Sequence, residues 1–114
     1  MRRCLALDLK DDAELIARYE AWHRPGDVPA PVVRSIREAG ILEMEIWRVA
    51  DRLFMVMEVG PDFSSEAKAA ADLASEDVQA WERLMSAFQK PLPGSASGEK
   101  WRGMRRIFAL SEQP

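Results

Sequence analysis

Residues 41–59, ILEMEIWRVADRLFMVMEV, decide the fold. Residues 41–49 alternate apolar side chains with charged or aromatic ones, which is the period of a β-strand with two different faces. Residues 53–59 form a dense apolar run, which is typical of a buried strand. Only a short link at Ala50 and Asp51 lies between the two runs. The stretch therefore predicts a β-hairpin.

Upstream of this hairpin, the sequence predicts one strand and two helical segments. Residues 4–9 have a period of two and few charges, which favours a strand covered on both faces. Helical spacing follows, from a cap at Asp11 or Asp12 to a stop at Pro25. A second helical segment spans residues 32–39. Two helices are thus expected before the hairpin.

Downstream of the hairpin, the pattern becomes helical again. An alanine-rich helix is expected as far as about Leu73, and Ser75 is suited to cap a second helix. That second helix carries one apolar stripe, made of Val78, Trp81, Met85 and Phe88. Residues 89–100 are expected to be a long loop, and residues 101–110 a final strand.

The predicted order is β, α, β, β, α, β, which is the ferredoxin-like arrangement of an α+β domain. Such a domain has one antiparallel sheet with its helices on a single face. A chain of 114 residues has the size of one globular domain, so we expect a single domain over residues 1–114. The uncovered face of the sheet would need a second copy of the chain or a ligand.

Composition excludes several classes of function. The net charge is −3 and the charges are interspersed, so no basic stripe is present for nucleic acid. The N-terminal apolar run is interrupted by Asp8, which fits neither a signal peptide nor a membrane span, so we expect a cytoplasmic protein. Cys4 is the one cysteine and His23 the one histidine, so we expect no intrachain disulfide and no metal site.

His23 is the first candidate for catalysis, because an ordinary imidazole has a pKa near neutrality and can both accept and donate a proton. Tyr19 lies four residues earlier, on the same face of a continuous helix. Both side chains could then contact one small hydroxylated ligand. The competing interpretation is a surface histidine at a helix C-terminus, where a positive charge is favoured.

Other side chains allow a structural and a functional interpretation. A tryptophan can stack on the C–H face of a sugar, or it can simply fill the core; the four are Trp22, Trp47, Trp81 and Trp101. A strand carboxylate could act as a partner acid or lie on a solvated face; these are Glu43, Glu45 and Glu58. An arginine group fits no phosphate motif; it consists of Arg102, Arg105 and Arg106.

Seven segments in a fixed order give the chain a family resemblance. They are Y-x-x-x-H-x-P at 19–25, SIREAGI at 35–41, MEIWR at 44–48, LFMVME at 53–58, VQAWERLM at 78–85, QKPLP at 89–93 and GEKW at 98–101. Over nearly its whole length the sequence resembles the L-rhamnose mutarotase family, including its L-fucose-acting relatives. The resemblance implies a homodimer, a dimeric α/β barrel, built from ferredoxin-like subunits. It also implies that the α and β anomers of a 6-deoxy-L-sugar, L-fucose or L-rhamnose, are interconverted without a cofactor.

The resemblance also implies roles for five residues. It places the family's proton-donating histidine on His23, its substrate-binding tyrosine on Tyr19 and a sugar-contacting tryptophan on Trp81. Met44 and Glu82 stand where rhamnose-type members have a second tyrosine and a second tryptophan, and both changes resemble the fucose-type branch. The substrate site is therefore expected to include all five residues.

Two other functions share this topology and stay open at this point. One is a dimeric barrel that binds a sugar or another small molecule without catalysis. The other is a cofactor-free barrel monooxygenase or a heme-handling protein, since a fold alone does not fix its chemistry.

Overall fold

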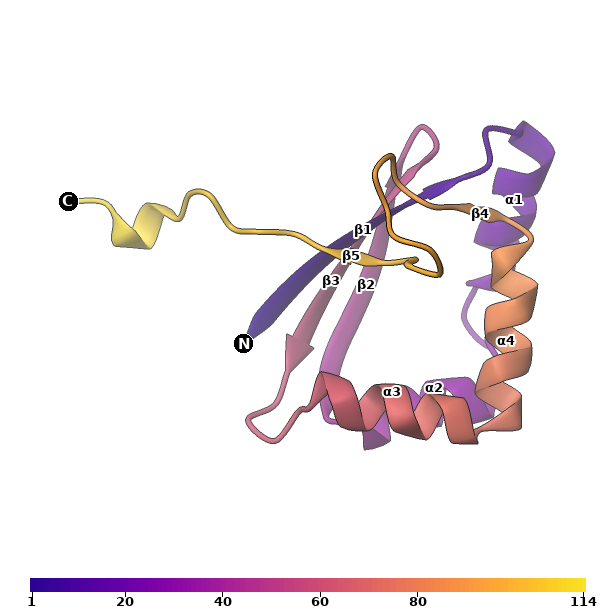
Figure 1. Cartoon of the computed structure of the whole chain (residues 1–114), viewed down its shortest axis with the longest axis horizontal. Coiled ribbons are helices and arrows are strands. Elements are labelled where there is room, and N and C mark those ends of the chain that lie inside the picture. The colour runs from indigo at the N-terminus through magenta and orange to yellow at the C-terminus, as the bar shows by residue number, and fades with distance from the viewer.

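The computed structural model describes residues 1–114. The chain forms five strands, four α-helices and one short 3₁₀ helix (Figure 1). In chain order these are β1 (Arg2–Leu9), α1 (Ala13–Trp22), α2 (Ala30–Glu38), β2 (Ile41–Val49), β3 (Arg52–Val59), α3 (Ser65–Ala74), α4 (Glu76–Ser86), β4 (Gln89–Lys90), β5 (Arg102–Gly103) and η1 (Leu110–Glu112). No helix has the length and apolarity needed to cross a membrane.

The sheet is antiparallel throughout, with the strand order β2, β3, β1, β4, and β5 also pairs with β1. The predicted hairpin is confirmed, because β2 and β3 pair along their length from Ile41 opposite Val59 to Val49 opposite Arg52. The sheet is open within one chain and does not close into a barrel. The predicted fold class, an α+β domain with a ferredoxin-like antiparallel sheet, is confirmed.

The final strand differs from the prediction for residues 101–110. Only residues 102–103 pair with β1, and a second short strand, β4, lies inside the predicted loop. The pairing of Leu5 with Gly103 would, if continued, set Arg3 opposite Arg105 and Arg2 opposite Arg106. Like charges directly opposite each other destabilise a strand pair. The chain therefore leaves the sheet after Met104, whose N–H still donates to the Cys4 carbonyl oxygen.

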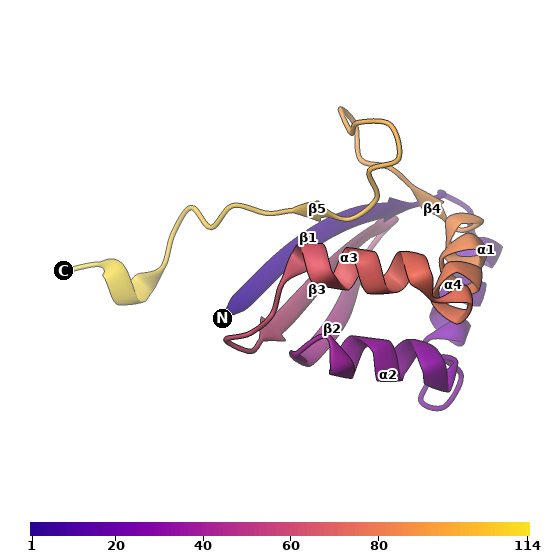
Figure 2. The ribbon, with the colours of Figure 1, turned by 60° about the horizontal axis from the view of Figure 1, so that its bottom comes forward.

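The residues after Met104 form an arm that projects away from the sheet and helices (Figures 1 and 2). The arm exposes large apolar side chains, including Ile107 at 86%, Phe108 at 64% and Leu110 at 77%. Within the arm, Arg106 forms an ion pair with Glu112. We call residues 105–114 the C-terminal arm below.

Three of the four α-helices, α1, α3 and α4, begin at a residue whose side chain caps the helix. Asp12 accepts a hydrogen bond from the Leu15 N–H at the start of α1, which confirms one of the two predicted caps. Ser64 and Ser75 cap α3 and α4 in the same way. All four helices lie to one side of the sheet, with α4 at the centre of the contacts to α2 and α3 (Figure 2).

The apolar core lies between the inner face of the sheet and these helices. One cluster consists of Leu9, Tyr19, Leu53, Met85 and Phe88, and a second consists of Ile41, Met55, Met57 and Val59. Strand β1 is covered on both faces, as its sequence predicts, because Leu7 and Leu9 on one face and Ala6 and Asp8 on the other are all buried. The first cluster supports α1, which carries the candidate catalytic residues.

Replacing Leu53 by alanine is expected to lower the free energy of unfolding by about 2–5 kcal/mol, since the side chain is 1% exposed and its removal leaves a cavity. Urea denaturation followed by tryptophan fluorescence would measure this. Leu73 is 75% exposed on α3, so Leu73→Ala should change stability by less than about 0.5 kcal/mol. Equal losses in the two variants would contradict the assignment of the core.

Candidate active site

An open cavity of about 920 Å³ lies between the inner face of the sheet and the helices. Its walls come from β1, β2, β3 and all four helices, and most of the side chains that line it are apolar. This volume is within the range of small-molecule sites. The structure brings all five predicted site residues to this one cavity: Tyr19, His23, Met44, Trp81 and Glu82.

Helix α1 sets the geometry of Tyr19 and His23. The spacing of four residues brings the two rings together on one face of the helix, with centroids 4.4 Å apart and ring planes tilted by 40°. Tyr19 also packs edge-on against the buried Phe88, which anchors this face in the core. His23 is the C-cap residue of α1, as its position before Pro25 predicts.

The hydrogen bonds of His23 fix its tautomer. Nδ1 lies 2.7 Å from the Tyr19 carbonyl oxygen, and a carbonyl can only accept, so Nδ1 carries the proton. In the neutral imidazole, Nε2 therefore holds a lone pair, and it has no hydrogen-bond partner in the protein. Burial lowers the pKa of His23 from its ordinary value of 6.5, and the hydrogen bond to the backbone of Tyr19 partly opposes this effect. At neutral pH, Nε2 is an available proton acceptor.

The phenol of Tyr19 is 3% exposed. Burial raises its pKa above the ordinary 10.0, and a hydrogen bond from Gln89 partly lowers it. The hydroxyl therefore keeps its proton at neutral pH. It can donate this proton to a ligand that enters the cavity.

Trp81 contributes both to the core and to the cavity wall. Its ring packs edge-on against His23, with centroids 5.5 Å apart, and against Trp22 at 6.2 Å. Trp81 also packs against the first core cluster. It is therefore both a core residue and a residue of the cavity wall. Met44 also lines the cavity, projects from β2 against the second core cluster and pairs with Met57. The cavity is thus lined by both aromatic and thioether side chains.

The remaining candidates from the sequence divide between the cavity and the surface. Trp101 and Glu43 line the cavity, whereas Trp47 is 60% exposed. The Glu58 carboxylate forms an ion pair with the N-terminal ammonium, and Glu45 accepts a long hydrogen bond from Trp47. Of the three strand carboxylates, only Glu43 therefore lines the cavity that contains the imidazole of His23.

Two polar residues of the site were missed as functional candidates. Gln89 lies in β4, and its amide nitrogen is 3.5 Å from the Tyr19 hydroxyl. Lys100 lies in the following loop, where its ammonium donates to the Ser86 hydroxyl, and its side chain lines the cavity. Both fall in the segment interpreted as a loop. Their only signal in the sequence is that they belong to the QKPLP and GEKW segments.

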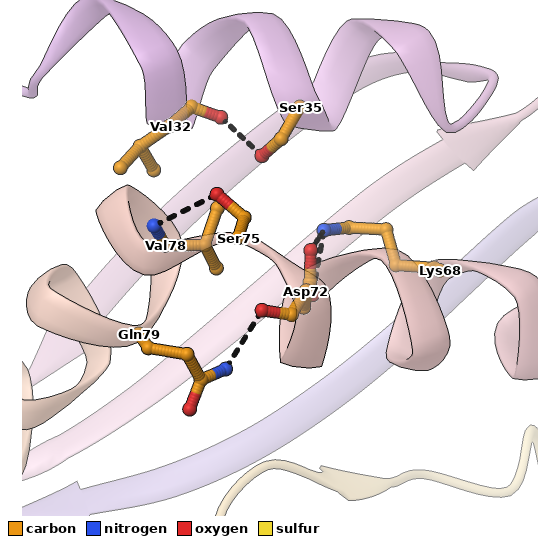
Figure 3. Close-up of polar contacts among 7 residues, drawn as sticks. All are labelled: Val32, Ser35, Lys68, Asp72, Ser75, Val78 and Gln79. Atoms are coloured by element: carbon orange, nitrogen blue, oxygen red, sulfur yellow. Dashed lines mark hydrogen bonds and ion pairs between the residues drawn. The ribbon is translucent and has the colours of Figure 1, made fainter.

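An ion pair lines the cavity where it passes α3 (Figure 3). Lys68 donates to both carboxylate oxygens of Asp72, at 2.7 and 2.8 Å, and both side chains are about four-fifths buried. Gln79 of α4 donates to the Asp72 carbonyl oxygen and joins the two helices. Ser35 of α2 also lines the cavity, and its hydroxyl donates to the Val32 carbonyl oxygen.

The family model for L-rhamnose mutarotase matches residues 2–110. The chain belongs to this family. An L-fucose mutarotase of Xanthomonas campestris pv. campestris is 60% identical over 111 residues, which cover 97% of this chain and 89% of that protein. A UPF0734 protein of Dictyostelium discoideum is 31% identical, with 92% of this chain and 86% of that protein covered. These matches confirm the family resemblance seen in the sequence and its closer similarity to the L-fucose-type branch. They also confirm the predicted enzyme class, a carbohydrate mutarotase.

Solved structures give the same fold at lower sequence identity. The crystal structure of the L-rhamnose mutarotase of Formosa agariphila superposes with a TM-score of 0.67, at 14% identity, and covers 96% of this chain and 98% of that one. The tetracenomycin F2 cyclase of Streptomyces glaucescens gives a TM-score of 0.55, at 18% identity, with 96% and 97% covered. The second likeness shows that this fold also supports a different chemistry.

Proposed function

We propose that this mutarotase acts on L-fucose and that His23 carries the proton transfer. The observation that supports this most is a neutral imidazole whose unpaired Nε2 belongs to a cavity-lining side chain, packed against the rings of Tyr19 and Trp81. The 60% identity to an L-fucose mutarotase supports the choice of sugar. Met44 and Glu82, the two departures from the rhamnose-type pattern, line the same cavity.

Mutarotation requires one proton to leave the anomeric hydroxyl and one to arrive at the ring oxygen. In the proposed mechanism, His23 Nε2 accepts the anomeric proton. The electron pair of that O–H bond forms the aldehyde C=O, and the bond between the anomeric carbon and the ring oxygen breaks. The ring oxygen keeps the bonding pair and takes the proton back from Nε2, which is the donor role that the family resemblance gives to His23. The aldehyde then rotates, and the reverse steps close the ring as the other anomer.

The other residues of the site would hold the sugar during these steps. Tyr19 would donate its phenolic proton to a sugar oxygen, and Trp81 would present an aromatic surface to the C–H bonds of the ring. No further base is needed, because the anomeric and ring oxygens are bonded to the same carbon and one imidazole can serve both. The two departures at Met44 and Glu82 would shape the pocket for the orientation of the remaining hydroxyls.

Saturation-transfer NMR tests this proposal, because saturating one anomeric proton signal lowers the other at the rate of exchange. We expect the protein to accelerate exchange of L-fucose above the buffer rate, and more than that of L-rhamnose or D-galactose. Saturable binding of L-fucose with exchange at the buffer rate would instead identify a non-catalytic sugar-binding protein. Faster exchange of L-rhamnose would overturn the choice of sugar.

The pH dependence follows from the neutral form of His23. Protonation of the imidazole removes the base. Because the pKa of His23 is lowered from 6.5, the acidic fall in kcat/KM lies below pH 6.5. We expect kcat/KM to be constant from about pH 6.5 to 8 and to fall about tenfold per pH unit below the pKa of His23. His23 is the one histidine of the chain, so its NMR titration gives that pKa directly. A fall in kcat/KM that lies above pH 6.5, or that does not coincide with the titration of His23, would contradict the assignment of His23 as the base.

We also propose that the chain forms a homodimer. The outer face of the sheet exposes Trp47 and Val49, and the C-terminal arm exposes Ile107 and Phe108. Two copies related by a two-fold axis would cover both apolar surfaces at once, since each copy offers the same arm and the same face. Sedimentation velocity at micromolar concentration is expected to give twice the chain mass of 12.9 kDa. A single chain at that concentration would contradict the dimer.

The location of the enzyme is proposed from its sequence. Cys4 is unpaired, which agrees with the reducing conditions of the cytoplasm. We therefore propose a cytoplasmic enzyme. Fluorescence imaging of the tagged full chain in cells would test this, and an extracellular signal would overturn it.

A further inference from the structure

Gln89 is placed between the sheet and the catalytic helix. It pairs with Leu9 as the first residue of β4, and its side chain lines the cavity beside Tyr19. The amide nitrogen Nε2 lies 3.5 Å from the Tyr19 hydroxyl oxygen. The amide oxygen Oε1 is buried and has no hydrogen-bond partner, and it is the one such side-chain atom in the protein.

An unpartnered buried carbonyl is unfavourable for stability. A methionine would fill nearly the same space without burying a polar atom, so packing alone does not account for an amide at Gln89. The amide donates to one group, the Tyr19 hydroxyl. This contact is at the long limit of a hydrogen bond, as contacts in unliganded active sites often are before substrate tightens them.

The direction of this hydrogen bond decides what Tyr19 can do. An amide N–H can only donate, so the Tyr19 oxygen is the acceptor and its own proton remains available. Apart from Gln89, no group of the protein hydrogen-bonds to this hydroxyl. Tyr19 is buried but lines the cavity, so a ligand in the cavity is the partner left for the phenolic proton.

We propose that Gln89 is a positioning residue that fixes the Tyr19 phenol as a hydrogen-bond donor to the sugar. Gln89 acts through Tyr19 and takes no part in proton transfer itself. The substrate oxygen it serves is a neutral hydroxyl or the ring oxygen, since both accept a hydrogen bond. This inference rests on the proposed function, because the sugar is what would occupy the cavity.

Gln89→Met tests the proposal, because it keeps the length of the side chain and removes the donor. We expect KM for L-fucose to rise about tenfold, which corresponds to one lost or misdirected hydrogen bond, and kcat to stay within about twofold. Gln89→Glu should raise KM at least as much at neutral pH, because a carboxylate accepts the phenolic proton and turns it away from the sugar. Unchanged KM in both variants would overturn the proposal.

A spectroscopic measurement separates positioning from a merely structural role. Tyr19 is the one tyrosine of the chain, so ultraviolet titration of phenolate reports this residue alone. Gln89 lowers the pKa of Tyr19 against the larger effect of burial, so Gln89→Met should raise that pKa further. A lower pKa in Gln89→Met would show that the amide accepts from the phenol instead, and would overturn the proposed direction.

Two controls complete the experiment. Gln79→Met makes the same substitution at an amide that joins α3 and α4 and does not line the cavity, and it should leave both KM and the Tyr19 titration unchanged (Figure 3). In a Tyr19→Phe background, Gln89→Met should add no further loss, because its effect passes through the phenol. Additive losses would overturn the proposal. If the wild type fails to accelerate exchange, the proposed function fails, and the phenolate titration still tests the contact of Gln89 with Tyr19.

Discussion

Replacing His23 by asparagine is expected to lower the enzymatic rate of L-fucose anomer exchange by about 100- to 10,000-fold, the usual contribution of a general acid or base. The asparagine amide can still donate to the Tyr19 carbonyl oxygen, which His23 Nδ1 does in the wild type. It has no basic lone pair in place of Nε2. The variant therefore separates the structural hydrogen bond of His23 from its proton transfer.

The measurement is saturation-transfer NMR at saturating L-fucose, with the rate in buffer subtracted. Glu20→Gln is the matched control on the same helix, because Glu20 is exposed, pairs with Arg48 and does not line the cavity. Its rate should stay within about twofold of the wild type. His23→Ala leaves space beside Trp81, and added imidazole should restore part of its rate. A wild-type rate in His23→Asn would remove the imidazole from the mechanism.

The sequence was sufficient for the parts of the fold that depend on local patterns. The hairpin at 41–59 combines a period of two at 41–49 with a dense apolar run at 53–59, on either side of a two-residue link, and Asp12 is a strong capping residue just before a helical period. Tyr19 and His23 were placed side by side by the helical repeat alone. In each case, the physical cause acts within a few residues of the chain.

The parts that were not predicted depend on residues far apart in the chain. The strand expected at 101–110 ends early because of Arg2 and Arg3, about a hundred residues away, and only the register reveals that conflict. Gln89 is polar and stands before a proline-rich loop, so nothing local indicates that it pairs with β1. Its contact with Tyr19 joins residues that are 70 positions apart. The proximity of Tyr19 and His23 on one helix can be predicted from sequence, whereas the contact of Gln89 with Tyr19 cannot.

The C-terminal arm provides the strongest test of assembly. Replacing Ile107 and Phe108 together by aspartate is expected to raise the dissociation constant of the proposed dimer by at least about a thousandfold. Burying each of these side chains contributes about 1.5–3 kcal/mol, and a two-fold dimer buries two copies of each. The fold of each subunit should persist, because these side chains are 86% and 64% exposed and belong to neither core cluster.

Sedimentation velocity over a concentration series measures this change, and circular dichroism checks that the variant is folded. Leu73→Asp is the matched control, since Leu73 is 75% exposed on α3, away from the arm. It should leave the dimer intact. A double variant that stays dimeric would mean that the two copies meet through the outer face of the sheet around Trp47 alone. If the monomeric variant also keeps the wild-type exchange rate, then each cavity is complete within one chain, because its walls need no residue of the partner.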